Sequence, residues 1–195
     1  MAGRPREFDK AAALVRARDL FWERGYEGVS MSDLVQALGI ASARIYAAFG
    51  SKENLFREAI ALYEANEGGF ADRALKEEPT ALRAIERMLR EGIELYTGKK
   101  NPRGCMVVAS ATNCSSENEP LREWLEQHRR ARTASIVKRI KKAIREGELP
   151  KKADAQAFGD LCAAALHGIS VQARDGVSRE RLLATVPLVL RLLQA

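Results

Sequence analysis

Apolar residues recur at every third or fourth position along almost the whole chain, and no stretch alternates with the two-residue period of a strand. This pattern predicts an all-α fold. The first predicted helix follows Asp9, a favourable N-cap residue, and ends before Gly25, a favourable terminator. One face of this helix is apolar and consists of Ala13, Leu14, Ala17, Leu20 and Phe21.

Two short helices are predicted next, separated by a single turn. The sequence SMSD has the spacing of a capping box, with Asp in place of the usual Glu, and predicts a helix that begins after Ser30 and ends at Gly39. The following helix is expected over about residues 43–49. Ile45 and Phe49 lie four positions apart in it and therefore share one inward face.

A fourth helix is expected to begin after Ser51, to be disturbed near Gly68 and to reach about residue 75. The Glu-Glu-Pro sequence at 77–79 marks the predicted boundary with the rest of the chain. Beyond it, apolar periodicity predicts helices over about residues 82–96, 105–111, 118–147, 154–176 and 178–193, the last of them kinked at Pro187.

The composition is that of a globular protein, since 46% of the 195 residues are hydrophobic and 30% are charged. The formal net charge of +6 mildly favours an acidic partner. Residues 1–56, however, carry eight basic and seven acidic side chains, whereas residues 121–152 carry eleven basic and four acidic ones. Net charge therefore does not locate a nucleic-acid site. We interpret the basic segment as the solvated face of a long helix, in preference to a second anionic contact.

The first ten residues are charged and lack the apolar core of a secretory signal, and the longest apolar run is too short to span a bilayer. Three cysteines, an odd number, indicate reduced thiols. We therefore expect a cytoplasmic protein with no membrane partner. The sequence has no phosphate-binding glycine-rich loop, zincin motif or nucleophile elbow, so we expect no catalytic residues, no cofactor and no metal site.

Short N-terminal helices, with a glycine-containing turn between the second and the third, are typical of a helix-turn-helix. In that motif the third helix enters the DNA major groove, which accounts for its small outer residues. The sequences LFWERGYEGVSMSDLVQALGI and ARIYAAFGSKENLF make residues 9–56 resemble the DNA-binding domain of the tetracycline-repressor (TetR/AcrR) family of bacterial transcriptional regulators. That family often places a capping serine at the position of Ala41, so Ser42 is expected to cap the third helix instead.

The resemblance implies a division of the chain. Residues 1–56 would form the helix-turn-helix DNA-binding domain, and helix four, about 51–75, would connect it to the rest. Residues 79–195 would form a larger helical domain for effector binding and dimerisation.

The resemblance also implies individual DNA contacts. Arg44, the only basic residue on the recognition helix, is predicted to reach a base edge, with a phosphate contact as the alternative. Tyr46 and Lys52 are predicted to hold phosphates, although Tyr46 could instead be a packing residue. The remaining predicted contacts are Ser30 and Ser32, the shape-determining Ser42, Ala43 and Ala47, and a minor-groove arm of Arg4 and Arg6 whose alternative is a disordered tail.

A homodimer bound to a palindromic double-stranded operator is implied as well, formed by the last two helices of each subunit. Small residues at 163–165 and Gly168 permit close helix approach. The apolar stripe of the final helix belongs either to this interface or to the monomer core, and consists of Leu182, Val186, Leu190 and Leu193.

A small-molecule effector is expected among the middle helices, where polar or aromatic residues interrupt apolar surfaces. The candidates are Tyr96, Met106, Asn113, Trp124, His128, His167 and Gln172.

Cys105 supports an alternative to regulation by a small-molecule effector. It follows Arg103 and Gly104 at a predicted helix N-terminus, where the helix dipole and a cation favour a thiolate, so a redox switch with Cys114 is possible chemistry. A thiol-dependent hydrolase using Cys105 and His128 is weaker, and an architectural DNA-binding protein lacks the broadly basic face it requires. We therefore predict a sequence-specific transcriptional regulator, a repressor that a small-molecule effector releases from its operator.

Overall fold

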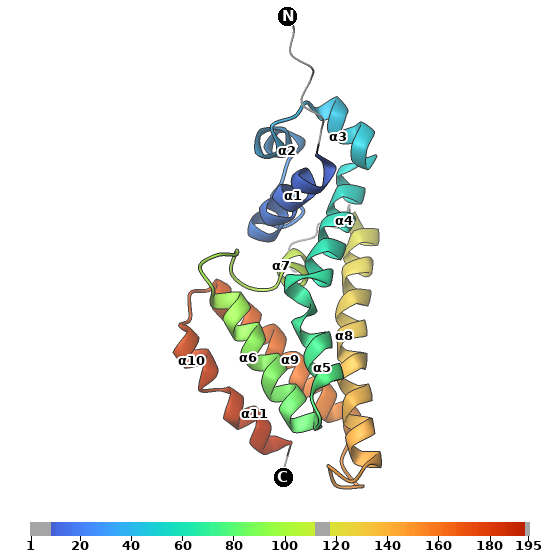
Figure 1. Cartoon of the computed structure of the whole chain (residues 1–195), viewed down its shortest axis with the longest axis vertical. Helices are drawn as coiled ribbons and strands as arrows, with labels where there is room; N and C mark the ends of the chain where they lie inside the picture. Colours follow the sequence, from blue (N-terminus) through green and yellow to red (C-terminus); the bar gives the residue numbers. More distant parts are fainter. Residues whose placement is uncertain (1–8, 112–117, 194–195) are drawn as a thin grey trace, which may run out of the picture.

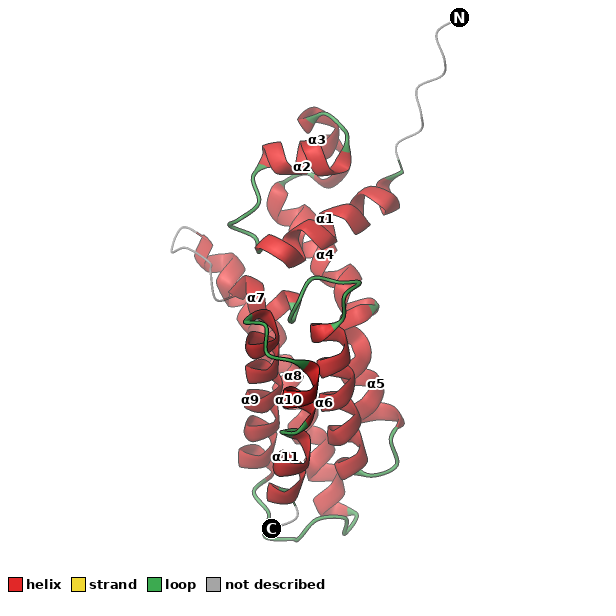
Figure 2. Cartoon of the chain, turned by 90° about the vertical axis from the view of Figure 1, so that its left-hand side faces the viewer, coloured by secondary structure: helices red, strands yellow, loops and turns green. Residues whose placement is uncertain are grey.

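The computed structural model describes residues 9–111 and 118–193. Within these ranges the chain folds into helices α1 to α11 and a short 3-10 helix, with no strand. The predicted all-α fold is confirmed. The molecule is elongated, with the first helices gathered at one end and the C-terminal helices at the other (Figures 1 and 2). None of the described helices combines the length and the apolar character needed to cross a bilayer.

The N-terminal unit contains α1, α2 and α3, and α4 leads out of it (Figure 1). Their bounds are Lys10–Arg24, Met31–Leu38, Ser42–Phe49 and Lys52–Ala65. Three of these helices begin at the side-chain caps that the sequence predicts. Asp9 Oδ1 accepts a hydrogen bond from the Ala12 amide at 3.0 Å, and Ser51 Oγ accepts one from the Asn54 amide at 3.0 Å. Ser30 starts α2 with a complete capping box.

Helix α3 begins differently from the prediction. Gly39 takes the left-handed conformation at the end of α2, with φ of +70°, and Ala41 becomes the extended N-cap of α3. Ser42 is then the first residue of the helix, and no side chain caps α3. The expectation that Ser42 caps this helix is wrong, because the turn places the cap one residue earlier.

The segment after α4 is divided into two short helices. Helix α4 ends at Ala65, the 3-10 helix η1 covers Glu67–Gly69, and α5 covers Phe70–Glu77. A Cβ atom at Gly68 would lie 2.4 Å from the ring of Tyr63, so only glycine permits this close approach. The predicted disturbance near Gly68 is confirmed.

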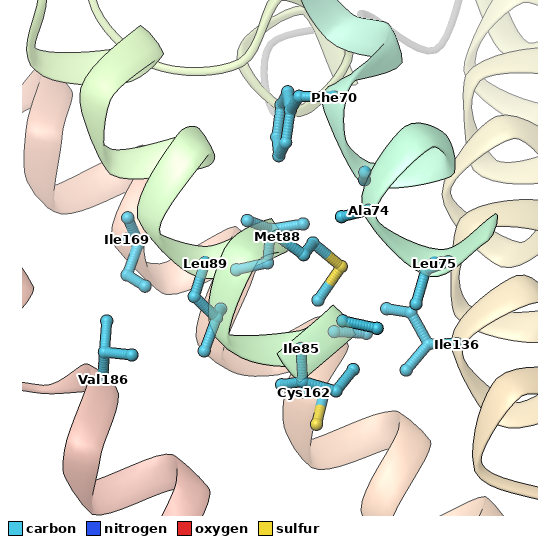
Figure 3. Close-up of a cluster of buried hydrophobic side chains, with 14 of the residues drawn as sticks. Phe70, Ala74, Leu75, Ile85, Met88, Leu89, Ile136, Cys162, Ile169 and Val186 are labelled. Atoms are coloured by element: carbon cyan, nitrogen blue, oxygen red, sulfur yellow. The ribbon is translucent and has the colours of Figure 1, made fainter. Parts of the chain in front are cut away.

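The remaining helices are α6 (Ala81–Thr97), α7 (Met106–Ala111), α8 (Glu119–Arg145), α9 (Ala155–Arg174), α10 (Arg179–Leu183) and α11 (Val186–Leu192). All of them except α7 build a second core with α5. Figure 3 shows Met88 and Leu89 of α6, Ile136 of α8 and Cys162 of α9 within this core. All four side chains are buried.

The C-terminal segment forms two separate helices, α10 and α11, where a single helix kinked at Pro187 was predicted. The chain leaves α10 after Leu183, and Pro187 lies in the first turn of α11, where its missing N–H has no intrahelical partner to lose. Leu182, Val186 and Leu193 are 1%, 0% and 3% exposed. These three residues belong to the monomer core, which is the second of the two alternatives predicted for this stripe. The fourth member of that stripe, Leu190, is partly buried against the same core.

Helix α7 joins the two units. Met106 and Val107 are buried with Trp22 of α1 and Tyr63 of α4 in the core of the N-terminal unit. The start of α8 contributes Leu121 and Leu125 to the same cluster, and these side chains are 2% and 0% exposed. The loop that precedes α7 therefore lies between the N-terminal unit and the C-terminal helices.

Candidate nucleic-acid interface and ligand cavity

Helix α3 has two contrasting sides and lies at one end of the molecule (Figures 1 and 2). Ile45 and Phe49 are 1% and 4% exposed and anchor the helix in the N-terminal core. The opposite side of this eight-residue helix is exposed and consists of Ser42, Ala43, Arg44, Tyr46 and Ala47. Because most of these side chains are short, the backbone of α3 can approach a groove closely.

A hollow of about 360 Å³ lies between α2 and α3. Met31, Ser32, Val35, Gln36 and Ser42 line it, so Ser32 and Ser42 share one surface. Gln36 is an exposed polar residue of this surface that the sequence analysis missed. Its spacing of four residues from Ser32 could have indicated that the two lie on one helix face.

The capping box of α2 engages the hydroxyl of Ser30. The Asp33 amide donates to Ser30 Oγ at 3.1 Å, and the Ser30 amide donates to Asp33 Oδ2 at 2.8 Å. Ser30 Oγ also donates to the same carboxylate. The hydrogen bonds from the side chain and backbone of Ser30 lower the pKa of Asp33, and nearby cations lower it further. A carboxylate therefore lies at the N-terminus of α2.

Lys52 occupies the first turn of α4 against an aromatic ring. Its Nζ atom lies 4.2 Å from the centroid of the Tyr26 ring, a cation–π distance. Burial lowers the pKa of Lys52, while the carboxylates of Glu27 and Asp33 oppose that shift. The ring thus holds an ammonium group close to the α3–α4 turn.

The predicted arm residues Arg4 and Arg6 lie outside the described residues.

A small cavity of about 40 Å³ is lined by residues of α4, η1, α5, α6, α8 and α9, by α7 and by Cys105, which precedes α7. Its polar lining includes Tyr63, Glu64, Cys105, Arg129 and Arg132. The cavity therefore borders α4, the helix that continues directly into the N-terminal unit.

The thiol of Cys105 lies beside the phenol groups of the cavity. The Tyr63 hydroxyl donates to Cys105 Sγ at 3.5 Å, and Tyr96 also forms a side-chain hydrogen bond with Cys105. The Cys105 amide donates to Ser170 Oγ at 2.8 Å, which ties this residue to α9. Burial raises the pKa of both tyrosines well above 10, so both phenols stay protonated.

Comparison with known proteins identifies the family to which this chain belongs. Residues 13–59 match the model for bacterial regulatory proteins of the tetR family, and residues 79–175 match the tetracyclin repressor-like C-terminal domain. The HTH-type transcriptional repressor ComR of Escherichia coli (strain K12) is 30% identical over 97% of this chain and 91% of its own length. The chain belongs to the tetR family of bacterial regulatory proteins.

Two further TetR-family relatives support this assignment. The HTH-type transcriptional repressor BdcR of Escherichia coli (strain K12) is 30% identical over 94% of this chain and 88% of its own length. A cysteine mutant of the TetR family transcriptional regulator CifR, solved with 26 bp double-strand operator DNA, is 42% identical with a TM-score of 0.92. That match covers 97% of this chain and 98% of CifR. The protein is thus a DNA-binding transcriptional regulator.

Part of the predicted effector pocket of this TetR-family regulator comes together in the cavity. Tyr96, His128 and His167 all line it, although they lie on different helices. Tyr63 and Arg129 also line the cavity, although neither was predicted from the sequence as a pocket residue. Tyr63 was not singled out within the fourth predicted helix, and Arg129 belongs to the basic segment 121–152 that was interpreted as a solvated face. Neither local pattern carried a signal for a cavity.

The other predicted pocket residues lie elsewhere. Met106 is 0% exposed in the N-terminal core, because α7 turns it toward that unit. Trp124 is not part of the cavity lining. The centroid of its ring lies 4.3 Å from that of His128 and 6.4 Å from that of Phe56. Gln172 is exposed on the outer side of α9. Asn113 lies outside the described residues.

The thiol alternatives receive little support from the geometry. His128 Nδ1 lies 2.9 Å from Glu64 Oε1, so this imidazole is paired with a carboxylate. Cys162 is fully buried, which raises the pKa of its thiol to about 12. Cys114 lies outside the described residues, so its pairing with Cys105 stays a prediction. Among the described residues, His, Cys, Asp and Glu form no cluster of three or more that could hold a metal ion.

Proposed function

We propose that this regulator is a repressor that binds a palindromic double-stranded operator through α3. The observation that carries the proposal is the two-sided character of α3, in which Ile45 and Phe49 are buried and Arg44 lies on an exposed side of mostly short residues. ComR and BdcR are named transcriptional repressors, which supports repression. The operator DNA in the CifR structure supports a duplex as the partner.

In this proposal Arg44 contacts a base edge in the major groove, while Tyr46 and Lys52 hold phosphates. Ser30 contributes the N-terminus of α2, because Asp33 already engages its hydroxyl. The remaining proposed contacts are Ser32, Ser42, Ala43 and Ala47, with Arg4 and Arg6 as a minor-groove arm.

We propose that the homodimer contact uses the outer side of α9 in each subunit. Leu161 and Val171 are 36% and 45% exposed, and Ala164 and Gly168 lie on the same helix face. A Cβ at Gly168 would meet no atom within 4 Å, so a partner helix can approach closely. Two subunits joined through these helices carry two α3 helices, as a palindrome requires.

The effector is proposed to bind in the cavity. Tyr63 and Glu64 of α4 line this cavity, and α4 starts three residues after α3 ends. A ligand that binds more tightly to a conformation with a wider cavity increases the population of dimers in that conformation, in which the α4 helices are displaced. The two recognition helices then no longer match successive major grooves, and the operator is released.

This mechanism divides the chain by role. Residues 1–56 contact DNA, helix four (about 51–75) connects, and residues 79–195 bind the effector and dimerise. The proposal includes no enzymatic step and places the protein in the cytoplasm.

The test is a mobility-shift experiment with purified protein, DNA from upstream of its own gene and random DNA of equal length. A repressor gives a discrete complex with the upstream DNA that persists in excess random competitor. Equal retention of both DNAs, removed alike by competitor, would instead indicate an architectural protein and contradict the proposal.

A further inference from the structure

A wide groove of about 1160 Å³ lies beside the C-terminal part of α8. Residues of α5, α8 and the start of α9 line it, together with Glu78, and seven of these lining residues are cationic whereas three are acidic. The sequence analysis interpreted this basic segment as the solvated face of a helix, but the structure adds a hollow and a further cation, Lys76 of α5. We propose that this groove binds the phosphate backbone of a second segment of double-stranded DNA, separate from the operator at α3.

Four of the cations are available to an anion. Three others, Arg130, Arg139 and Lys142, each form an ion pair with a glutamate. The remaining four are exposed, and within residues 9–111 and 118–193 they form neither an ion pair nor a hydrogen bond; they are Lys76, Lys138, Lys141 and Arg145. The spacing of the last three, at i, i+3 and i+7, places them on one face of α8.

The three carboxylates of the groove do not neutralise these four cations, because each carboxylate already has another partner. Asp72 and Glu78 form ion pairs with arginines that do not line the groove. Asp160 accepts a hydrogen bond from Gln156 Nε2 at 3.0 Å. The groove therefore has an excess of positive charge that an anionic partner would stabilise.

An operator bound at α3 is too distant to be this partner. With a rise of about 1.5 Å per residue, Lys138 and Arg145 lie about 30 and 40 Å along α8 from its first residue, Glu119. Figure 1 shows α3 at one end of the molecule and the orange C-terminal part of α8 near the other end. Salt screens exposed charges beyond about 10 Å, so these cations contribute little to binding at α3.

The lining of the groove favours phosphates over a peptide or a single strand. The apolar residues Leu75 and Val137 are only 9% and 5% exposed, so an amphipathic peptide would find little apolar surface for its anchors. No aromatic ring lines the described groove, so unpaired bases would have no stacking surface. The backbone of a duplex requires only cations.

The size of the groove and the activity of the protein favour DNA as the source of these phosphates. Its volume exceeds the range of about 300–1,000 Å³ that is typical of small-molecule pockets, which favours an extended partner. A regulator held at its operator also meets further duplex segments of the same DNA at a raised local concentration. The inference goes beyond the proposed operator contact and requires no recognition of bases.

The test adds a second duplex to protein whose α3 helices are already occupied. The full-length protein is saturated with unlabelled DNA from upstream of its own gene, and a labelled duplex of random sequence is titrated in and followed by fluorescence anisotropy. We expect saturable binding at low salt. The logarithm of the affinity should fall with the logarithm of the salt concentration with a slope of about −3.6, since each of four phosphates contributes about 0.9.

The double variant Lys138→Gln/Lys141→Gln should bind the labelled duplex about tenfold more weakly, with a slope reduced to about −1.8, and should keep its affinity for the upstream DNA. The double variant Lys99→Gln/Lys100→Gln is the matched control. It removes two exposed lysines that do not line the groove, and it should bind the labelled duplex like wild type.

Three results would overturn the inference. They are the absence of saturable binding at low salt, an equal loss of binding in both double variants, and tighter binding of a poly-glutamate peptide than of the duplex. The comparison of the two variants reports on the groove whether or not the upstream DNA carries an operator. Failure of the inference is therefore distinguished from failure of the repressor proposal.

Discussion

The indole Nε1 of Trp22 donates a 2.8 Å hydrogen bond to the backbone carbonyl of Gly104, which lies 82 residues away in the sequence. Gly104 has a φ of +79°, and a Cβ there would lie 2.9 Å from the Ser170 carbonyl oxygen on α9. Arg174, also on α9, donates to the carbonyls of Trp22 at 3.2 Å and Glu23 at 2.7 Å. The end of α1 is thus joined to α9 and to the residue that precedes Cys105 of the cavity.

The Trp22 hydrogen bond should contribute measurably to stability. Trp22→Phe removes the ring N–H and leaves the buried Gly104 carbonyl without this donor, so we expect the free energy of unfolding to fall by about 1–3 kcal/mol. Urea denaturation monitored by circular dichroism measures it. Trp124→Phe is the control, since no hydrogen bond from the Trp124 indole is found within residues 9–111 and 118–193. Similar losses in both variants would show that ring size, not the hydrogen bond, matters.

Base preference should depend on Arg44. In Arg44→Ala we expect discrimination between the operator and its single-base variants to shrink by about 1–3 kcal/mol at one position of each half-site. Tyr46→Phe, which loses only a hydroxyl, should weaken binding about equally for all of these DNAs. Fluorescence anisotropy with a set of operator variants measures both effects. Arg90→Ala, a surface substitution in α6, controls for net charge. A uniform loss of affinity in Arg44→Ala would assign this residue to phosphate instead.

Dimerisation should depend on the outer side of α9. Val171 is 45% exposed in the isolated chain, and Val171→Asp would bury a charge in the proposed interface. We expect this variant to elute as a monomer in size-exclusion chromatography with light scattering. Leu188→Asp is the matched control, because Leu188 is an apolar residue of similar exposure (52%) on a different helix, α11. A dimeric Val171→Asp protein would place the interface elsewhere.

Cys162 should be inert in the folded protein. Its burial raises the thiol pKa to about 12, so at pH 8 only about one molecule in ten thousand carries the thiolate that alkylating reagents require. Iodoacetamide at pH 8 should therefore leave Cys162 unmodified until urea unfolds the chain, as peptide mass spectrometry can measure. Rapid labelling of Cys162 under native conditions would mean that the core between α6 and α9 opens frequently.

The capping box predicts an acid dependence of stability. The pKa of Asp33 is lowered below its ordinary value of 3.8 in the folded protein, so its stabilising effect is complete above that value and is lost as the pH falls through the lowered pKa. Asp33→Asn should therefore be less stable than wild type at neutral pH. The difference should narrow once the pH falls below 3.8, which thermal unfolding across a pH series measures. A difference that stays constant into strong acid would assign the effect to something other than the ionised carboxylate.

Local features of the N-terminal unit were predictable because their causes are local. Asp9, Ser30 and Ser51 cap their helices through bonds to amides three residues away, and each cap was correctly predicted. The buried pair Ile45 and Phe49 followed from a four-residue spacing alone. The start of α3 was misplaced by one residue, because the conformation of the preceding turn decides which residue becomes the cap.

The amino-acid sequence by itself determined that the chain is helical, where most helices begin, and which side of α3 is left for a partner, since periodicity and capping act within one or two turns. Only the tertiary structure decided which residues enclose the cavity, that Met106 belongs to the N-terminal core, and that Leu182 and Val186 belong to the monomer. These outcomes depend on how helices distant in sequence pack against one another. No local pattern encodes the meeting of Tyr63, Tyr96, Arg129 and His167, because each comes to the cavity from its own position on α4, α6, α8 or α9.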